Sequence, residues 1–363
     1  MVDTRRILFI LQILFISSGC SNQIHSRIVL FKSTANYNYR IPGIIVSLKG
    51  TLIAYGEQRN GISDWAVSNI VQRRSEDNGQ TWSSEQIIVK GENTQVTINN
   101  PVMISDDNKL ILVYCVNYGL KTKNGGIYER ESTDDGITWS EPREILKDTN
   151  EFNVFATGPG HGIKCTNGRL IIPCWMVKKT ENQNEKSHHP GTVCTIYSDD
   201  HGNTWIKGEN VPQGNVIDPN ESTIIELKDG YLLLNIRNQS ETKCRAVSKS
   251  NSGIDNWSLA QLDTSLIDPV CFASAAKFKN KILFVNCNSR VKREKLSVQL
   301  FDNSFSKSIL TKLIKEEGGY ADIATDNKLI YLLHEKRETK KNVNPSTNFS
   351  LELDIFNLDW LKN

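Results

Sequence analysis

The sequence predicts an all-β fold, a six-bladed β-propeller with Asp-box turns, and three observations lead to this prediction. A tight turn followed by an apolar strand recurs six times, an eight-residue motif recurs three times, and a strand-like segment lies near each end. Repeats of this kind are typical of architectures in which each unit buries its apolar surface against its neighbours.

The six apolar segments share one plan. Each opens with Gly or Asn in a two-residue turn of the β-hairpin kind and continues as a strand-length run of leucine and β-branched residues. They are KGTLIAYGEQR from Lys49, DNKLILVYCVN from Asp107, NGRLIIPCWMV from Asn167, DGYLLLNIRNQ from Asp229, KNKILFVNCNS from Lys279 and DNKLIYLLHEK from Asp326. Continuous apolar runs indicate strands that are buried on both faces.

The spacing of these segments, about 47 to 62 residues, suits a four-stranded sheet with its loops. Six such sheets cannot bury both faces alone, but in a radial arrangement each packs against two neighbours. The segments SRIVLFKS from Ser26 and SLELDIFNLDW from Ser350 resemble strands that belong to no blade. We expect them to share a blade and close the ring, so that residues 26–361 form a single propeller domain.

The eight-residue motif, here called the Asp box, predicts a turn at the outside of a blade. It reads SEDNGQTW from Ser75, STDDGITW from Ser132 and SDDHGNTW from Ser198, with an altered copy, SNSGIDNW, from Ser250. Its Asp can bond to local backbone N–H groups, and its Trp can pack between strands. A calcium loop is the weaker alternative, because the acidic spacing lacks the distal Glu of an EF-hand.

The first residues have the pattern of an export signal. MVDTRR is followed by the apolar run ILFILQILFI and by SSGC, and this run is too short to span a bilayer. We expect residues 1–20 to be a signal peptide. Cys20 fits a lipoprotein signal as well as simple secretion, so two locations stay open: a secreted protein, or a lipoprotein anchored in the periplasm or at the cell surface.

Composition argues against several other classes of partner and site. The 363 residues carry a formal net charge of +2 and no long basic run, so nothing favours nucleic acid as a partner. Seven cysteines follow Cys20 without CxxC spacing, and we interpret them as small buried residues that allow for one disulfide. The histidines at positions 161, 188 and 189 lack partners at the spacing of metal ligands, so we expect no metal site. We also expect no cofactor and a monomeric protein.

Charged residues and one tyrosine gather at the ends of the predicted strands, which meet around one mouth in a propeller. These positions are Arg40, Arg59, Asp64, Glu221, Arg237, Arg290, Arg293, Tyr320 and Glu335. Surface ion pairing would explain any single arginine, but several arginines at one mouth repel one another unless an anion lies between them. Because guanidinium groups clamp carboxylates through paired hydrogen bonds, the pattern predicts a ligand that carries a carboxylate.

With these motifs, the chain resembles the exo-sialidases (neuraminidases) of the bacterial and animal type over nearly its whole mature length. The motifs are YRIP at Tyr39–Pro42, the Asp boxes, the spacing of Arg59 and Asp64, FATGPGHG at Phe155–Gly162, PNES at Pro219–Ser222, the spacing of Arg293 and Leu296, and GGYAD at Gly318–Asp322. The resemblance implies that three arginines clamp the carboxylate of a sialic acid: Arg40, Arg237 and Arg293. Arg290 is the rival of Arg293, Glu335 would orient Arg40, and Arg59 would contact the sugar near its O4 hydroxyl.

The resemblance also implies the catalytic roles. Tyr320 would be the nucleophile, Glu221 its base and Asp64 the general acid and base. A tyrosine suits this substrate, because the anomeric carbon of a sialic acid already carries a carboxylate that would repel a carboxylate nucleophile. A phenol has a pKa of about 10 and needs an adjacent base to take its proton.

We therefore expect an exo-α-sialidase, a retaining glycoside hydrolase that removes terminal sialic acids from sialylated glycans. A propeller that binds such glycans without cutting them is one alternative, and it would need the arginine clamp but not the catalytic residues. A trans-sialidase or an intramolecular transglycosylase is another. That choice depends on water access and on aromatic residues near the acceptor, for which Trp65 and Trp175 are candidates.

Overall fold

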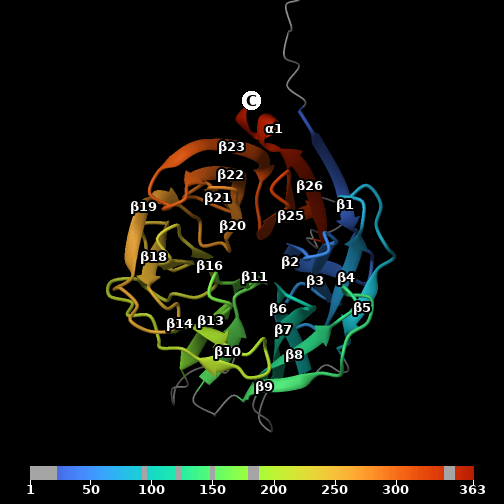
Figure 1. The fold of residues 1–363 in the computed structure, drawn as a ribbon, viewed down its shortest axis with the longest axis horizontal. Coiled ribbons are helices and arrows are strands. Elements are labelled where there is room, and N and C mark those ends of the chain that lie inside the picture. The colour runs from blue at the N-terminus through green and yellow to red at the C-terminus, as the bar shows by residue number, and fades with distance from the viewer. Residues whose placement is uncertain (1–22, 92–95, 119–124, 148–151, 179–187, 339–347) are drawn as a thin grey trace, which may run out of the picture.

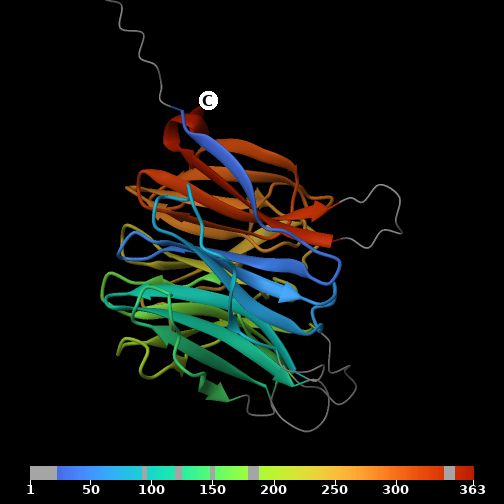
Figure 2. The ribbon, with the colours of Figure 1, turned by 90° about the vertical axis from the view of Figure 1, so that its right-hand side faces the viewer.

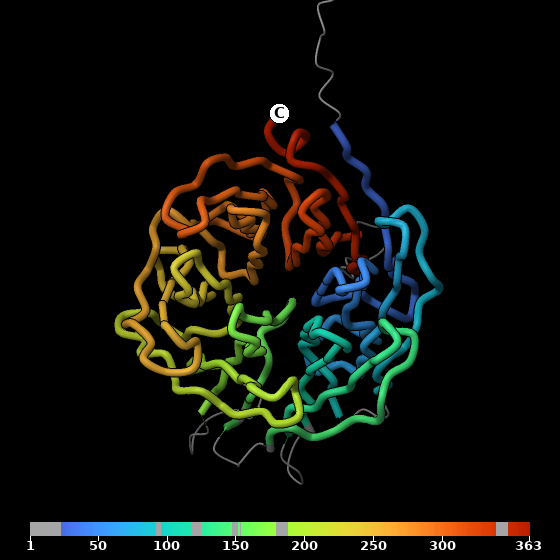
Figure 3. Tube along the Cα trace, in the orientation of Figure 1, coloured from blue at the N-terminus to red at the C-terminus, as the bar shows by residue number. Residues whose placement is uncertain are grey.

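A computed structural model describes residues 23–91, 96–118, 125–147, 152–178, 188–338 and 348–363. Six sheets, antiparallel except for the two-residue strand β11 (Gly160–His161), form a ring around a central axis, and the chain passes from each sheet to its neighbour in sequence order (Figures 1 and 3). The fold is therefore a six-bladed β-propeller, as predicted. The expected signal peptide and Cys20 lie outside the described residues.

Four strands make up the first blade, and the second and third blades have short additions. Blade one consists of β2 (Asn38–Val46), β3 (Leu52–Arg59), β4 (Ser68–Ser75) and β5 (Gln86–Val89). Blade two consists of β6 (Val96–Asp106), β7 (Lys109–Tyr118), β8 (Gly126–Ser132) and β9 (Arg143–Lys147), with β11 (Gly160–His161) parallel to β6. Blade three consists of β10 (Phe152–Thr157), β13 (Leu170–Lys178), β14 (Gly191–Ser198) and β15 (Ile206–Lys207), with β12 (Ile163–Lys164) beside β13.

The other three blades have four strands each, and the last contains both terminal strands. Blade four consists of β16 (Ser222–Glu226), β17 (Leu232–Ile236), β18 (Cys244–Ser250) and β19 (Gln261–Ile267). Blade five consists of β20 (Ser274–Phe278), β21 (Lys281–Cys287), β22 (Glu294–Asp302) and β23 (Ser308–Glu317). Blade six consists of β24 (Ala321–Thr325), β25 (Leu329–Glu338), β26 (Asn348–Asn357) and β1 (His25–Phe31).

The six predicted apolar segments are the second strands of the six blades, which confirms that prediction. Their two-sided burial comes from contacts between blades. Ile53 and Tyr55 of β3, for example, belong to the same buried cluster as Met103 and Leu112 of blade two. Each blade therefore provides part of the core of its neighbour.

The two ends of the described chain close the ring, as the sequence predicted. β1 pairs antiparallel with β26, and His25 lies opposite Phe356. The tail differs from the prediction at its end, where Leu358–Lys362 form the short helix α1 instead of continuing the strand. The Asn357 side chain accepts a hydrogen bond from the Trp360 N–H and so caps this helix. α1 lies beside the start of β1 (Figures 1 and 2), and the His25 ring stacks on Trp360 with centroids 4.1 Å apart.

Hydrogen bonds at the Asp boxes confirm their structural role. In the first box, Ser75 Oγ accepts from Gly79 N at 2.8 Å, and Asp77 accepts from Thr81 N at 2.8 Å and Thr81 Oγ1 at 2.6 Å. The bonds from Thr81 and Ser75 lower the pKa of Asp77 to about 2. The same pattern recurs around Ser132, Asp134, Gly136 and Thr138, and around Ser198, Asp200, Gly202 and Thr204.

The seven cysteines after Cys20 are all buried and free of disulfides. Their interpretation as small core residues is confirmed, and the allowed disulfide is not present among them. In the part of the chain that the structure describes, no helix is long and apolar enough to cross a bilayer.

Candidate active site

A cavity of about 270 Å³ receives residues from all six blades. The predicted site residues that line it are Arg40, Arg59, Asp64, Glu221, Arg237, Arg293 and Tyr320. Glu335 lies behind one of these arginines rather than on the wall of the cavity. The structure therefore brings together segments that are far apart in the sequence, as the propeller symmetry predicted.

Strand ends position most of these side chains. Arg59 is the last residue of β3, Glu221 directly precedes β16, and Arg237 directly follows β17. Arg293 directly precedes β22 and Tyr320 directly precedes β24. Because equivalent strand ends converge in a propeller, each blade contributes its residue at the same level of the axis.

Arg40 is positioned differently from the other arginines, because it lies inside a strand and not at a strand end. It lies within β2, next to a break in register between Arg40 and Gly43. Ile41, inside this irregularity, has a φ of 55°, an unfavourable conformation for a β-branched residue. A bulge of this kind re-aims the neighbouring side chain, and backbone strain of this type is concentrated at functional sites.

Tyr320 and Glu221 form a direct hydrogen-bonded pair. The Tyr320 hydroxyl lies 2.6 and 2.8 Å from the two carboxylate oxygens of Glu221. Arg237 Nη1 donates to this hydroxyl at 2.6 Å and also to the Glu221 carboxylate. Burial raises the pKa of Tyr320 well above its ordinary value, although Arg237 and Arg293 act in the opposite direction. The phenol therefore keeps its proton in the unliganded site.

Three guanidinium groups surround the Tyr320 ring. The guanidinium carbons of Arg40, Arg237 and Arg293 lie 5.8, 6.0 and 5.2 Å from its centroid. Glu335 joins the clamp to the tyrosine, because one carboxylate oxygen lies 2.5 Å from Arg40 Nε and the other accepts from Tyr320 N at 3.1 Å. Burial would lower the pKa of Arg40, but Glu335 outweighs it and raises that pKa. All three arginines stay cationic.

Arg290, the rival of Arg293, is outside this group. Its side chain is exposed, and Nη1 donates to the carbonyl of Thr242. Arg293 lines the cavity and has one hydrogen bond to a backbone carbonyl, that of Val270, at 3.3 Å. Of the two candidates, Arg293 is the one whose position allows contact with a ligand in the cavity.

Arg59 and Asp64 form an ion pair on the other wall. Arg59 Nη1 lies 2.6 Å from Asp64 Oδ1, and the Arg59 Nε lies 2.5 Å from Glu57 Oε2. Burial would raise the pKa of Asp64, but the Arg59 guanidinium outweighs it and holds that pKa below its usual range. Asp64 is therefore ionised in the unliganded site.

Sequence reasoning missed three residues at this site. Glu57 stands two positions before Arg59, on the same face of β3, and that alternation was the available signal. Phe349 lies under the clamp, with the Arg40 guanidinium 4.5 Å from its centroid. His188 lines the cavity, and its ring centroid lies 5.5 Å from that of Trp175. No pattern in the sequence marked the last two.

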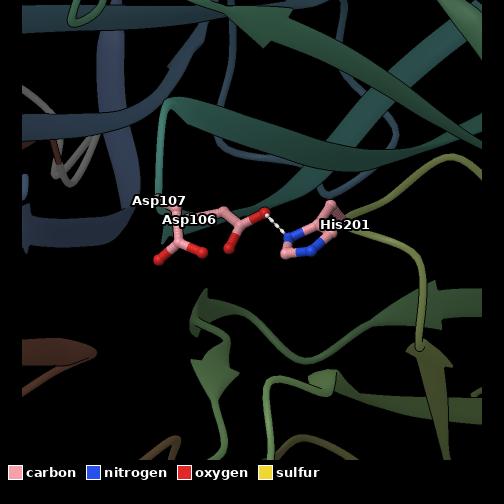
Figure 4. A group of neighbouring side chains, drawn as sticks. All are labelled: Asp106, Asp107 and His201. Carbon is pink, nitrogen blue, oxygen red and sulfur yellow. Dashed lines mark hydrogen bonds and ion pairs between the residues drawn. The ribbon is translucent and has the colours of Figure 1, made fainter.

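One cluster of described residues has the composition of a metal site but contains its own cation. Asp106, Asp107 and His201 lie together on a hairpin and a turn, with His201 Nδ1 2.9 Å from Asp106 Oδ2 (Figure 4). Lys164 Nζ lies 2.7 Å from Asp106 and 2.5 Å from Asp107. The ammonium group supplies the positive charge, so we interpret this cluster as an ion-pair network.

Comparisons with known proteins agree with the fold and with the family that the sequence motifs resemble. The family model described as a BNR repeat-like domain matches residues 69–332. A sialidase of Micromonospora viridifaciens is 30% identical over 72% of this chain and 44% of its own length. An exo-alpha-sialidase of Arthroderma benhamiae is 25% identical over 95% of this chain and 92% of its own. The chain thus spans less than half of the first relative and nearly all of the second.

Solved structures show the same fold. Hadza microbial sialidase Hz136 has a TM-score of 0.74 at 22% identity, over 88% of this chain and 66% of that one. The intramolecular trans-sialidase from Ruminococcus gnavus has a TM-score of 0.75 at 16% identity, over 93% of this chain and 98% of that one. With the domain match across more than half of its length, the chain belongs to the sialidase family with BNR repeats.

Proposed function

We propose that the protein is an exo-α-sialidase that removes terminal sialic acids with retention of configuration and uses Tyr320 as its nucleophile. One observation carries the proposal: a buried phenol is hydrogen-bonded to the carboxylate of Glu221 and encircled by three arginines. Sialylated glycans are the corresponding substrates. Export, with or without a tether at Cys20, suits such substrates and rests on the sequence pattern of residues 1–20.

Substrate binding would use the positive charge around Tyr320. The carboxylate of a sialic acid would lie between Arg40, Arg237 and Arg293, where paired N–H···O bonds fix its orientation. This places the adjacent anomeric carbon near the Tyr320 hydroxyl. Burial makes these charged bonds stronger than they would be in water.

The chemical step would begin with proton transfer from Tyr320 to Glu221. The phenolic oxygen then forms a bond to the anomeric carbon while the bond to the leaving oxygen breaks, and Asp64 gives that oxygen a proton. In the second half, Asp64 takes a proton from water and the water oxygen bonds to the anomeric carbon. The bond to the tyrosine oxygen breaks, and Tyr320 takes its proton back from Glu221. Two displacements at one carbon give net retention.

The alternatives are distinguished by what they require. A binding propeller needs the arginine clamp but has no use for a buried tyrosine–glutamate pair, and that pair favours an enzyme. Transfer to another sugar, or within the same sugar, uses the same first half-reaction. Product analysis therefore decides between hydrolysis and transfer.

The test compares Tyr320→Phe with the wild-type protein on a fluorogenic aryl sialoside. We expect the variant to lose activity by on the order of 10³-fold, since the attacking oxygen is removed. Proton NMR of the wild-type reaction should show the α-anomer of free sialic acid first. Tyr331→Phe is the matched control, because Tyr331 is also buried and its hydroxyl donates to Asp326, which does not line the cavity. Equal rates for both variants, or a β-anomer first, would contradict the proposal.

A further inference from the structure

The guanidinium of Arg59 lies between two carboxylates that differ in their surroundings. Arg59 is only 1% exposed and Glu57 is fully buried, whereas 58% of the Asp64 side chain is exposed. Nε faces Glu57 at 2.5 Å and Nη1 faces Asp64 at 2.6 Å. One buried cation is therefore shared by a fixed anion and by the proposed acid of the reaction.

The next blade fixes Glu57 in place. Glu57 Oε1 accepts a hydrogen bond from the backbone N–H of Asn100 at 2.7 Å. The Asn99 side-chain amide lies 3.5 Å from Glu57 Oε2 and 3.3 Å from the backbone carbonyl of Asp64. Both asparagines belong to β6, so the network connects blade one to blade two and also holds the loop that carries Asp64.

The charges of this network act on one another. Asp64 faces the cations Arg59 and Arg40, the imidazole of His188 and the carboxylate of Glu57. Glu57 in turn faces Arg59, Asp64 and the buried thiol of Cys115. Burial raises the pKa of Glu57, and each carboxylate raises the pKa of the other because like charges repel.

We propose that Glu57 is a positioning residue of the sialidase reaction, which fixes Arg59 and shares its charge so that Asp64 can still take up a proton. The inference rests on the proposed function. An acid that protonates the leaving oxygen must carry a proton at the moment of transfer. Arg59 already lowers the pKa of Asp64, and an undivided Arg59 charge would lower that pKa further. Glu57 offsets that charge without touching the substrate.

The test uses Glu57→Gln, which removes the charge and keeps the shape. kcat/KM is measured against pH with two substrates, sialyllactose and a nitrophenyl sialoside. Without Glu57, the pKa of Asp64 falls, so the basic limb of the sialyllactose profile should move down by about one pH unit. The nitrophenyl sialoside has a good leaving group that needs little proton donation, so its rate should change much less.

Glu129→Gln is the matched control. Glu129 is also buried, accepts from Arg143 Nε at 3.0 Å and Trp205 Nε1 at 2.7 Å, and does not line the cavity. We expect it to lower the thermal stability and to leave both pH profiles unchanged. A purely structural role of Glu57 would give the same result as this control.

Each outcome decides the matter. An unshifted basic limb in a folded Glu57→Gln protein overturns the inference, while wild-type activity leaves the proposed function standing. A wild-type protein that cleaves neither substrate defeats the proposed function itself. If Glu57→Gln does not fold, Glu57→Asp replaces it. The retained charge should keep the basic limb of the sialyllactose profile within about 0.3 pH unit of wild type while KM rises. A downward shift of about one pH unit would contradict the inference.

Discussion

Burial decides the protonation of Tyr320 at the scale of single residues. The side chain is only 5% exposed, and its pKa is raised even though Arg237 donates to its oxygen at 2.6 Å. Arg237 and Arg293 favour the phenolate, but in the unliganded site they do not outweigh burial. An enzyme with this nucleophile therefore depends on Glu221 to take the proton.

The two rival arginines of blade five give a test at this scale. Arg293→Ala should reduce kcat/KM by about 10- to 150-fold, because hydrogen bonds to a charged group contribute about 1.5–3 kcal/mol. Arg290→Ala should change it by less than about twofold, since that side chain is exposed. Steady-state kinetics with an aryl sialoside measures both, and the reverse order of effects would assign the clamp to Arg290.

The sequence predicted the cavity residues at strand ends but not those that support them. Arginines that directly follow an apolar run are conspicuous in the sequence, because a charged side chain is rarely buried without a partner. Glu57 lies inside the apolar strand itself. Its spacing places it on the same face of β3 as Arg59, but spacing alone does not show that the two side chains pair. Tertiary structure alone brings His188 to the cavity and Phe349 to the Arg40 guanidinium.

At the scale of elements, the Asp boxes connect each blade to the one before it. The Gly202 turn of blade three lies against Ile111 of blade two, where an added Cβ would be 2.6 Å from the Ile111 Cδ1. The backbone carbonyl of Gly202 also accepts from Arg143 of blade two. The turn therefore stabilises an interface between blades as well as a hairpin.

Gly202→Ala tests this connection. The residue has a φ of +85°, so alanine adds backbone strain of about 1–2 kcal/mol and an overpacking cost of about 1–3 kcal/mol. Gly230→Ala is the matched control, because Gly230 has a φ of +84° and open space around the added Cβ. Urea unfolding should show a loss of about 2–5 kcal/mol for the first variant and about 1–2 kcal/mol for the second. Equal losses would mean that the turn acts within its own hairpin only.

A further turn with the hydrogen bonds of an Asp box lies in blade five, and the sequence did not predict it. Asp302 of blade five accepts hydrogen bonds from Ser306 N at 2.8 Å and Lys307 N at 3.0 Å. These bonds, with one from Ser304, lower the pKa of Asp302. The segment lacks the Gly and Trp of the motif, so only its Asp remains to be recognised. The turn itself requires only the Asp carboxylate, whereas recognition of the turn in the sequence depends on the whole Asp-box motif.

For the whole molecule, ring closure depends on a buried carboxylate in β26. Asp354 is fully buried and accepts from His25 Nε2 at 2.7 Å and Arg27 Nε at 2.8 Å, both in β1, and from His334 Nε2 at 2.9 Å. Burial would raise the pKa of Asp354, but these partners outweigh it and lower that pKa. Its stabilising effect is thus present above about pH 4 and is lost as the pH falls further.

Asp354→Ala should therefore destabilise the entire protein. Removal of one partner from a buried charged group costs about 3–5 kcal/mol, and the chain should unfold in a single transition at lower urea. Glu76→Gln is the control, because the Glu76 side chain is largely exposed where it pairs with Arg74, and an ion pair with an exposed partner contributes less than about 1 kcal/mol. Below about pH 3, the difference between Asp354→Ala and wild type should shrink. A two-step transition with the midpoint of the main step unchanged would show that β1 detaches alone.

The pairing of β1 with β26 also fixes the order of events during synthesis. His25 and Asp354 are 329 positions apart, and a ribosome that adds about 5–20 residues per second needs tens of seconds to cover that distance. Of the described strands, β1 is therefore made first and finds its partner last, and its edge toward β26 stays unpaired until β26 is synthesised. Such an edge is a template for association with other chains, so the growing polypeptide is exposed to aggregation through this edge until β26 is made.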